Sequence, residues 1–69
     1  MNPSNINAIL ELINRGIQIG GELVPIALRA YAALRDESGL SDDELTTRSI
    51  ALNDPAGVKL RKLIAETEG

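Results

Sequence analysis

Cysteine, histidine, phenylalanine and tryptophan are all absent from this chain of 69 residues, and Tyr31 is its only aromatic residue. Without cysteine and histidine, disulfide bonds, thiolate zinc sites and Cys–His catalytic pairs are excluded. The sequence also lacks a glycine-rich phosphate loop with its lysine and a cluster of metal-ligating residues. These absences predict a protein that is not an enzyme and that uses no cofactor or metal.

Positive charge is scarce, because seven Lys and Arg residues stand against ten Asp and Glu residues and give a formal net charge of −3. This balance argues against nucleic acid as the main partner. The lightly charged stretch 16–34 has the length of a membrane span, but Glu22 and Arg29 would each cost roughly 2.5–3.5 kcal/mol near the bilayer centre. The first residues lack the cationic start and apolar run of a secretory signal. We therefore expect a cytoplasmic chain and treat membrane contact as a less favoured alternative.

Apolar residues recur with the period of an α-helix in the first half of the chain. When the helical wheel is continued without a reset through the pair Gly20-Gly21, Glu22 and Arg29 return to the polar arc. A turn at the glycines would have no reason to preserve that phase. The pattern therefore predicts one long amphipathic helix over residues 5–37.

Pro25 opposes this continuity, because it removes one backbone hydrogen bond and crowds the carbonyl group of Gly21. Its wheel position is on the polar side, which is the convex side of a curved helix. We expect a bend at this point, and a break near the glycine pair is the alternative.

Two shorter helices are predicted in the second half. Gly39 suits the left-handed position after a helix, and residues 41–44, Ser-Asp-Asp-Glu, form a capping box that starts a helix over about 41–52. The pair Asp54-Pro55 reads as a cap followed by proline at the first helical position, which predicts a third helix over about 55–67.

The expected fold is a single small all-α domain, residues 1–69. Its long helix carries more apolar surface than the rest of the domain can bury. A helix of about 33 residues is about 50 Å long, whereas a compact domain of this size has a radius of gyration of about 11 Å. Its apolar arc is about 200° wide, beyond the roughly 100° of a helix that rests on one core. The two short helices cannot cover that surface, so we expect oligomerisation or docking on a larger assembly to complete the fold.

We expect some residues of the apolar arc to lie in the internal core and others to contact this partner. Gly16 and Gly20 form a Gly-x-x-x-Gly pair at which two helix backbones could approach closely, or they accommodate a side chain or the bend. The candidate interface residues are Ile9, Ile13, Gly16, Ile17, Gly20, Leu23, Val24, Leu28 and Tyr31.

Acidic residues concentrate over 36–44 without any cation among them. Their spacing matches no calcium-binding loop, and acids in the first turn of a helix complement its dipole, so we interpret them mainly as caps. The alternative is a contact with a basic partner through Asp36, Glu37, Asp42 and Asp43.

From Leu40 onward the sequence LSDDELTTRSIALNDPAGVKLRKLIAE resembles the carboxy-terminal half of short all-helical proteins encoded by bacteriophages and prophages. These proteins combine a long apolar helix with a Ser/Thr-Asp-x-Glu-Leu cap and an Asn-Asp-x-Ala step. Pro25 and the pair Gly20-Gly21 depart from that pattern. The resemblance implies a phage accessory protein, located in the host cell or in the phage particle, and it carries over no catalytic or binding residue.

These observations together predict a non-enzymatic interaction protein that assembles with copies of itself or with a larger protein structure through apolar helix packing. One alternative is a small inhibitor or regulator of a host protein that uses the acidic segment 36–44 as its contact. A membrane-active helix is a third possibility.

Overall fold

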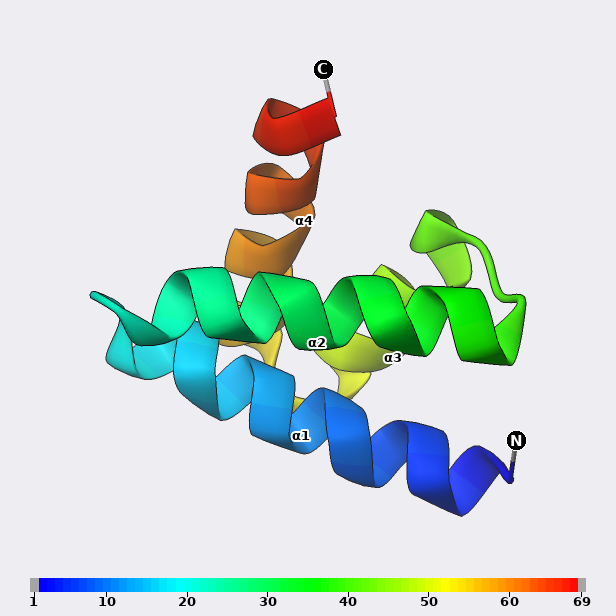
Figure 1. Ribbon diagram of the computed structural model, residues 1–69. Coiled ribbons are helices and arrows are strands. Elements are labelled where there is room, and N and C mark those ends of the chain that lie inside the picture. Colours follow the sequence, from blue (N-terminus) through cyan, green and yellow to red (C-terminus); the bar gives the residue numbers. More distant parts are fainter. Residues whose placement is uncertain (1, 69) are drawn as a thin grey trace.

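The computed structural model describes residues 2–68. This part of the chain contains four α-helices: α1 (Pro3–Ile19), α2 (Leu23–Ser38), α3 (Asp42–Leu52) and α4 (Asp54–Glu68). α1 and α2 form an antiparallel hairpin, α3 and α4 lie behind it, and α4 runs steeply across the hairpin (Figure 1). The radius of gyration is 10.6 Å. The expected all-α class is confirmed.

The predicted helix over residues 5–37 is wrong, because the chain turns back at the glycine pair. Gly20 has φ 82° and ψ −160°, and Gly21 has φ 61°. A residue with a side chain rarely adopts either conformation, and the first is accessible essentially only to glycine. Pro25 is the third residue of α2 and lies in its first turn, where a backbone N–H has no acceptor within the helix. The hairpin removes the 50 Å rod, so the length argument for assembly fails.

The caps of the later helices agree with the sequence, apart from one shift. Gly39 ends α2 in the left-handed conformation, with φ 71°. The hydroxyl group of Ser41 accepts a hydrogen bond of 3.1 Å from the backbone N–H of Glu44, and α3 follows as predicted. At α4, by contrast, the amide oxygen of Asn53 accepts a bond of 3.4 Å from the N–H of Ala56. The cap is therefore Asn53, and Asp54 is the first helical residue.

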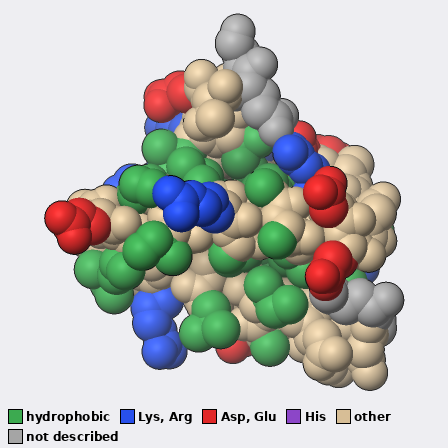
Figure 2. All heavy atoms as spheres, viewed as in Figure 1, with side chains coloured by type: hydrophobic (Ala, Val, Ile, Leu, Met, Phe, Trp, Pro, Cys, Tyr) green, Lys and Arg blue, Asp and Glu red, His purple; other side chains and the backbone are tan. Residues whose placement is uncertain are grey.

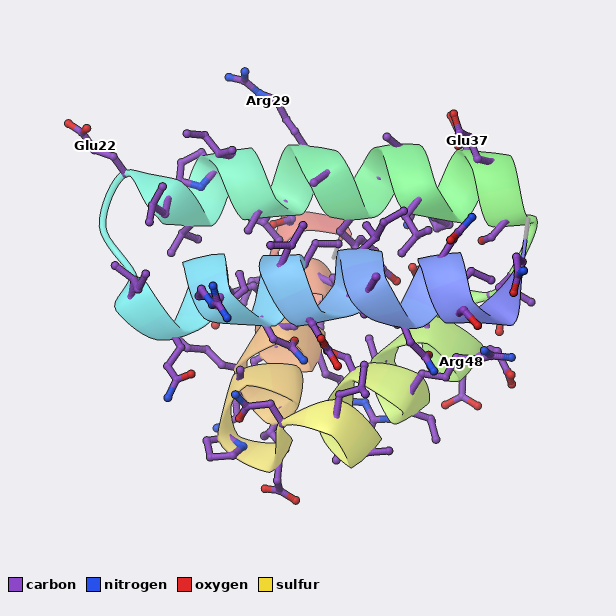
Figure 3. The ribbon with its side chains drawn as sticks, turned by 90° about the horizontal axis from the view of Figure 1, so that it is seen from below. Glu22, Arg29, Glu37 and Arg48 are labelled. Atoms are coloured by element: carbon purple, nitrogen blue, oxygen red, sulfur yellow. The ribbon has the colours of Figure 1, made fainter. Side chains whose placement is uncertain are left out.

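The core lies where α1 meets the other three helices. Figure 3 shows α1 between α2 on one side and the pair α3 and α4 on the other, and α1 contributes the largest share of the buried apolar side chains. The buried apolar residues that form this core are Ile6, Leu10, Ile13, Ile17, Ala27, Tyr31, Leu34, Leu45, Leu60 and Ile64. Within α4, the apolar face turned toward this core is formed by Leu60 and Ile64.

α1 and α3 are joined by a buried polar contact. Asn14 of α1 is only 1% exposed. Its amide nitrogen donates to the carbonyl oxygen of Ser49 at 3.1 Å, and its amide oxygen accepts from the Ser49 hydroxyl group. One turn further along both helices, Asn53 donates to Gln18 at 3.2 Å. The inner face of α3 is accordingly polar at Ser49, and the apolar side chain of Leu52 at the end of the helix is exposed.

α3 and α4 touch through their backbones at Gly57. An added Cβ atom on Gly57 would lie 2.4 Å from the backbone nitrogen of Ile50 and 2.7 Å from the carbonyl carbon of Ser49. Ordinary contacts of a Cβ atom are longer than about 3.4 Å, so only glycine allows this approach. Gly57 therefore sets the distance between the two helices.

Candidate functional site

Large apolar side chains remain exposed on the outer face of the hairpin. Leu12 and Ile19 on α1 are 66% and 65% exposed, and Leu23 and Ile26 on α2 are 38% and 57% exposed. Figure 2 shows hydrophobic side chains gathered over α1 and α2 on the face turned away from α3 and α4. Scattered apolar residues are normal on a protein surface, but a contiguous group on one face is typical of an interaction site.

These side chains line a groove between the two helices, with Gly16 at its floor. The Cβ atom of Ala27 would lie 3.2 Å from a Cβ atom added to Gly16, so two small residues bring α1 and α2 close together here. The groove has a volume of about 300 Å³. That volume is at the lower limit of the roughly 300–1,000 Å³ of small-molecule pockets, and the groove is open along its length, so side chains of a helix fit it better than an enclosed ligand. The lining residues are Ile9, Leu12, Ile13, Arg15, Gly16, Ile19, Leu23, Ile26, Ala27 and Ala30.

Charged side chains border the groove and do not enter its floor. Arg15 lines the edge formed by α1. Glu22, which directly precedes α2, and Arg29 and Glu37 on α2 point away from the bundle along one side of the helix (Figure 3). Glu22 and Arg29 are exposed, and neither takes part in an ion pair with another residue of the 2–68 range. The groove is therefore apolar in the centre and charged at its margins, as in protein interfaces with an apolar core and a polar rim.

The structure divides the predicted interface residues between the core and this groove. Ile13, Ile17 and Tyr31 are buried, whereas Ile9, Val24 and Leu28 are partly buried against the core. Ile9, Ile13, Gly16 and Leu23 line the groove, and Gly20 terminates α1.

Six groove residues were not among the predicted interface positions, and three of them carry large apolar side chains. Leu12, Ile19 and Ile26 lie at one edge of the apolar arc. Their position on the wheel gave no signal, because Leu10 at the opposite edge is fully buried.

One of the four predicted contact residues of the acidic segment, Asp42, is used inside the chain, and the other three are exposed. The carboxylate group of Asp42 accepts a hydrogen bond from the Tyr31 hydroxyl group and forms an ion pair with Arg35 at 2.9 Å. Asp36, Glu37 and Asp43 are exposed. Within residues 2–68 no three of the acids gather in an arrangement that could hold a metal ion. Asp42 thus links the start of α3 to α2, and it is the least available of the four predicted contact residues.

Comparison of the chain with protein-family models, curated proteins and solved structures finds no match. The resemblance to phage-encoded helical proteins stays a prediction. Over the part of the chain that the structure describes, no helix combines the length and the apolarity needed to cross a lipid bilayer.

Proposed function

We propose that this protein is a non-enzymatic helical interaction module that takes part in an assembly by docking its α1–α2 groove against a helical surface of a partner. The role implied by the phage resemblance, an accessory protein of the particle or of the infected cell, is compatible with this activity. The chain acts by burying apolar surface, and its own fold holds the docking face in place.

The observation that carries the proposal is the exposure of Leu12, Ile19 and Ile26 on one face of a chain with so small a core. Burying one such side chain is worth about 1.5–3 kcal/mol, whereas a whole domain of this size is stable by only about 3–10 kcal/mol. Leaving several of them in water forgoes a large share of the attainable stability. A partner that covers them recovers this free energy, which is the usual reason for such a face.

The preferred occupant is a helix because of the groove's shape. Two antiparallel helices with small residues at their contact leave a straight groove between them. A third helix can place side chains into this groove from its positions i, i+3, i+4 and i+7. The apolar lining favours Leu, Ile or Met at those positions.

A binding experiment tests this proposal with a defined probe. The probe is a fluorescein-labelled synthetic helix that carries leucine at i, i+3, i+4 and i+7 and only alanine and glutamine elsewhere, so it reports on the apolar groove alone. Fluorescence anisotropy should rise when the purified chain is titrated to micromolar concentration. Ile26→Asp should abolish the rise, because it places a charge in the groove.

Val58→Asp is the matched control, since Val58 is an exposed apolar residue of α4 outside the groove. This variant should bind the probe as the unchanged chain does. Absence of binding by the unchanged chain, or equal loss in both variants, would remove the basis of the proposed function.

A further inference from the structure

We propose that the occupant of the groove is a second copy of this chain, packed so that the two α2 helices run antiparallel across a two-fold axis. This inference rests on the proposed function and names its partner. Its support comes from the symmetry of the apolar residues and the order of the charges on α2, and the size of the face limits its strength.

The size of the face suits a small, reversible dimer. α1 and α2 are each about 25 Å long by their rise per residue, and two adjacent helices are about 20 Å wide, so the face measures on the order of 500 Å². The smallest stable interfaces bury about 600 Å² per partner. Two copies centred near the turn of the hairpin overlap over only about eight residues of each helix, or roughly 12 Å, and so bury about half of this face. The contact is smaller than a stable interface, which predicts a weak dimer that dissociates at hundreds of micromolar or above.

The apolar residues are arranged almost symmetrically about one position along the axes of α1 and α2, which we call the level of Gly16. Leu12 and Ile19 lie four residues before and three residues after Gly16. Gly16 in turn lies against Leu23 and Ala27 of α2, so the level of Gly16 corresponds to residues 25–26. A two-fold axis through this level, perpendicular to the helices, brings Leu12 of each copy near Ile19 of the other.

The charges on α2 select the same level. Glu22 and Arg29 are seven residues apart, which is about two helical turns, and both project from the same side of α2 (Figure 3). Their midpoint also lies between residues 25 and 26. In an antiparallel pair centred there, Glu22 of each copy faces Arg29 of the other, and two ion pairs form at the rim of the interface. The apolar centre and the charge centre therefore coincide.

A two-fold axis parallel to the helices gives a less favourable arrangement. It would place α1 of each copy over α2 of the other and bring Arg15 near Arg29, both with positive charge. The antiparallel arrangement instead brings the two copies of Arg15 together near the axis, so this residue opposes the dimer. An acidic partner helix would instead be attracted by Arg15. Neutralising Arg15 should therefore tighten binding of a second copy and weaken binding of an acidic helix.

Sedimentation equilibrium of the full chain, from micromolar to millimolar concentration, tests the second copy directly. The unchanged chain should form a dimer. Glu22→Arg and Arg29→Glu should each weaken dimerisation about tenfold, because two attractive pairs become repulsive, and the double variant should recover the original affinity to within about threefold. Arg15→Gln should tighten the dimer by about twofold to fivefold, since it removes the like-charged pair.

Glu37→Arg is the matched control for net charge. Glu37 projects from α2 as Glu22 does, but it lies beyond the end of the paired segment, so its reversal should leave the dissociation constant within about twofold (Figure 3). Helical circular dichroism of every variant verifies that the fold is retained, which is expected because Glu22 and Arg29 are exposed.

Three results would overturn the inference: a monomer at millimolar concentration, a dimer unchanged by the single reversals, or a double variant that does not recover. A monomer that still binds the synthetic helix would refute the second copy and leave the proposed function standing. A monomer that binds no helix would refute both.

Discussion

Replacement of Gly57 by alanine is the perturbation whose cost follows most directly from the structure. The new Cβ atom would lie 2.4 Å from the nitrogen and 2.5 Å from the Cα atom of Ile50. Both opposing atoms belong to the backbone of α3, so no change of side-chain rotamer can relieve the clash. α3 and α4 must move apart by about 1 Å, and the contacts of Leu45 and Leu60 in the core must loosen with them.

The expected loss of stability combines two effects of opposite sign. Overpacking of a core costs about 1–3 kcal/mol, and a clash between backbones belongs at the upper end. Alanine is a better helix former than glycine by about 1 kcal/mol, which offsets part of that cost. We expect Gly57→Ala to lower the free energy of unfolding by about 2 kcal/mol, which corresponds to a decrease in Tm of about 8–16 °C for a domain of this size.

Thermal unfolding followed by circular dichroism measures this change, and Ala51→Gly supplies the matched control. Ala51 is exposed on α3, so its replacement reports helix propensity alone and should cost about 1 kcal/mol. If Gly57 had no packing role, Gly57→Ala would raise Tm by a similar amount. An increase in Tm would therefore refute the packing of α3 against α4 described above.

Three further substitutions test other parts of the fold. Asn14→Ala should lower the free energy of unfolding by about 1–3 kcal/mol, because it leaves the buried hydroxyl group of Ser49 without its partner, while the Ser49 carbonyl group keeps its bond from the N–H of Asn53. A double-mutant cycle with Ser49→Ala, measured by urea denaturation, should show a coupling of about 1 kcal/mol or more. Gly20→Ala should cost about 1–3 kcal/mol while Gly21→Asn costs less than about 1 kcal/mol, because asparagine tolerates the left-handed conformation; a continuous helix would instead be stabilised by the first change. Tyr31→Phe should cost about 1 kcal/mol in the same denaturation assay through loss of its hydrogen bond, and an unchanged midpoint would show that this bond contributes nothing.

The helix ends after residue 38 could be predicted because capping is a local matter. The left-handed Gly39 and the bond from Ser41 to the N–H of Glu44 depend on residues within one turn of each other. The shift of the last cap from Asp54 to Asn53 has the same origin, since both side chains can accept such a bond and the choice depends on where α3 ends.

The turn at Gly20-Gly21 could not be recognised from the phase of the wheel. An apolar arc of about 200° covers more than half of the circle, so the arcs of two separate helices overlap at any relative phase. The apparent continuity of Glu22 and Arg29 with the earlier polar arc therefore carried little information. Pro25 was the better signal, because a proline in the first turn of a new helix has no cost and a proline inside a long helix costs about 3 kcal/mol.

The division of the apolar arc between core and groove depends on contacts between distant segments. Ile17 and Ile19 are equally apolar and adjacent in sequence, yet α3 and α4 bury the first and leave the second exposed. Asn14 is buried for the same reason, since Ser49 of α3 reaches it from 35 residues away. The sequence indicated that more apolar surface exists than one core can cover, and only the packing directions of α3 and α4 show which part remains.

Nuclear magnetic resonance of the isotope-labelled chain, recorded from micromolar to millimolar concentration, tests most directly whether the α1–α2 groove is a docking face for a second copy. If the groove binds a second copy, the backbone amides around Leu12, Ile19, Leu23 and Ile26 should show concentration-dependent shifts, with α3 and α4 unchanged. Shifts confined to α3 and α4, or spectra independent of concentration throughout, would refute docking of a second copy at the groove.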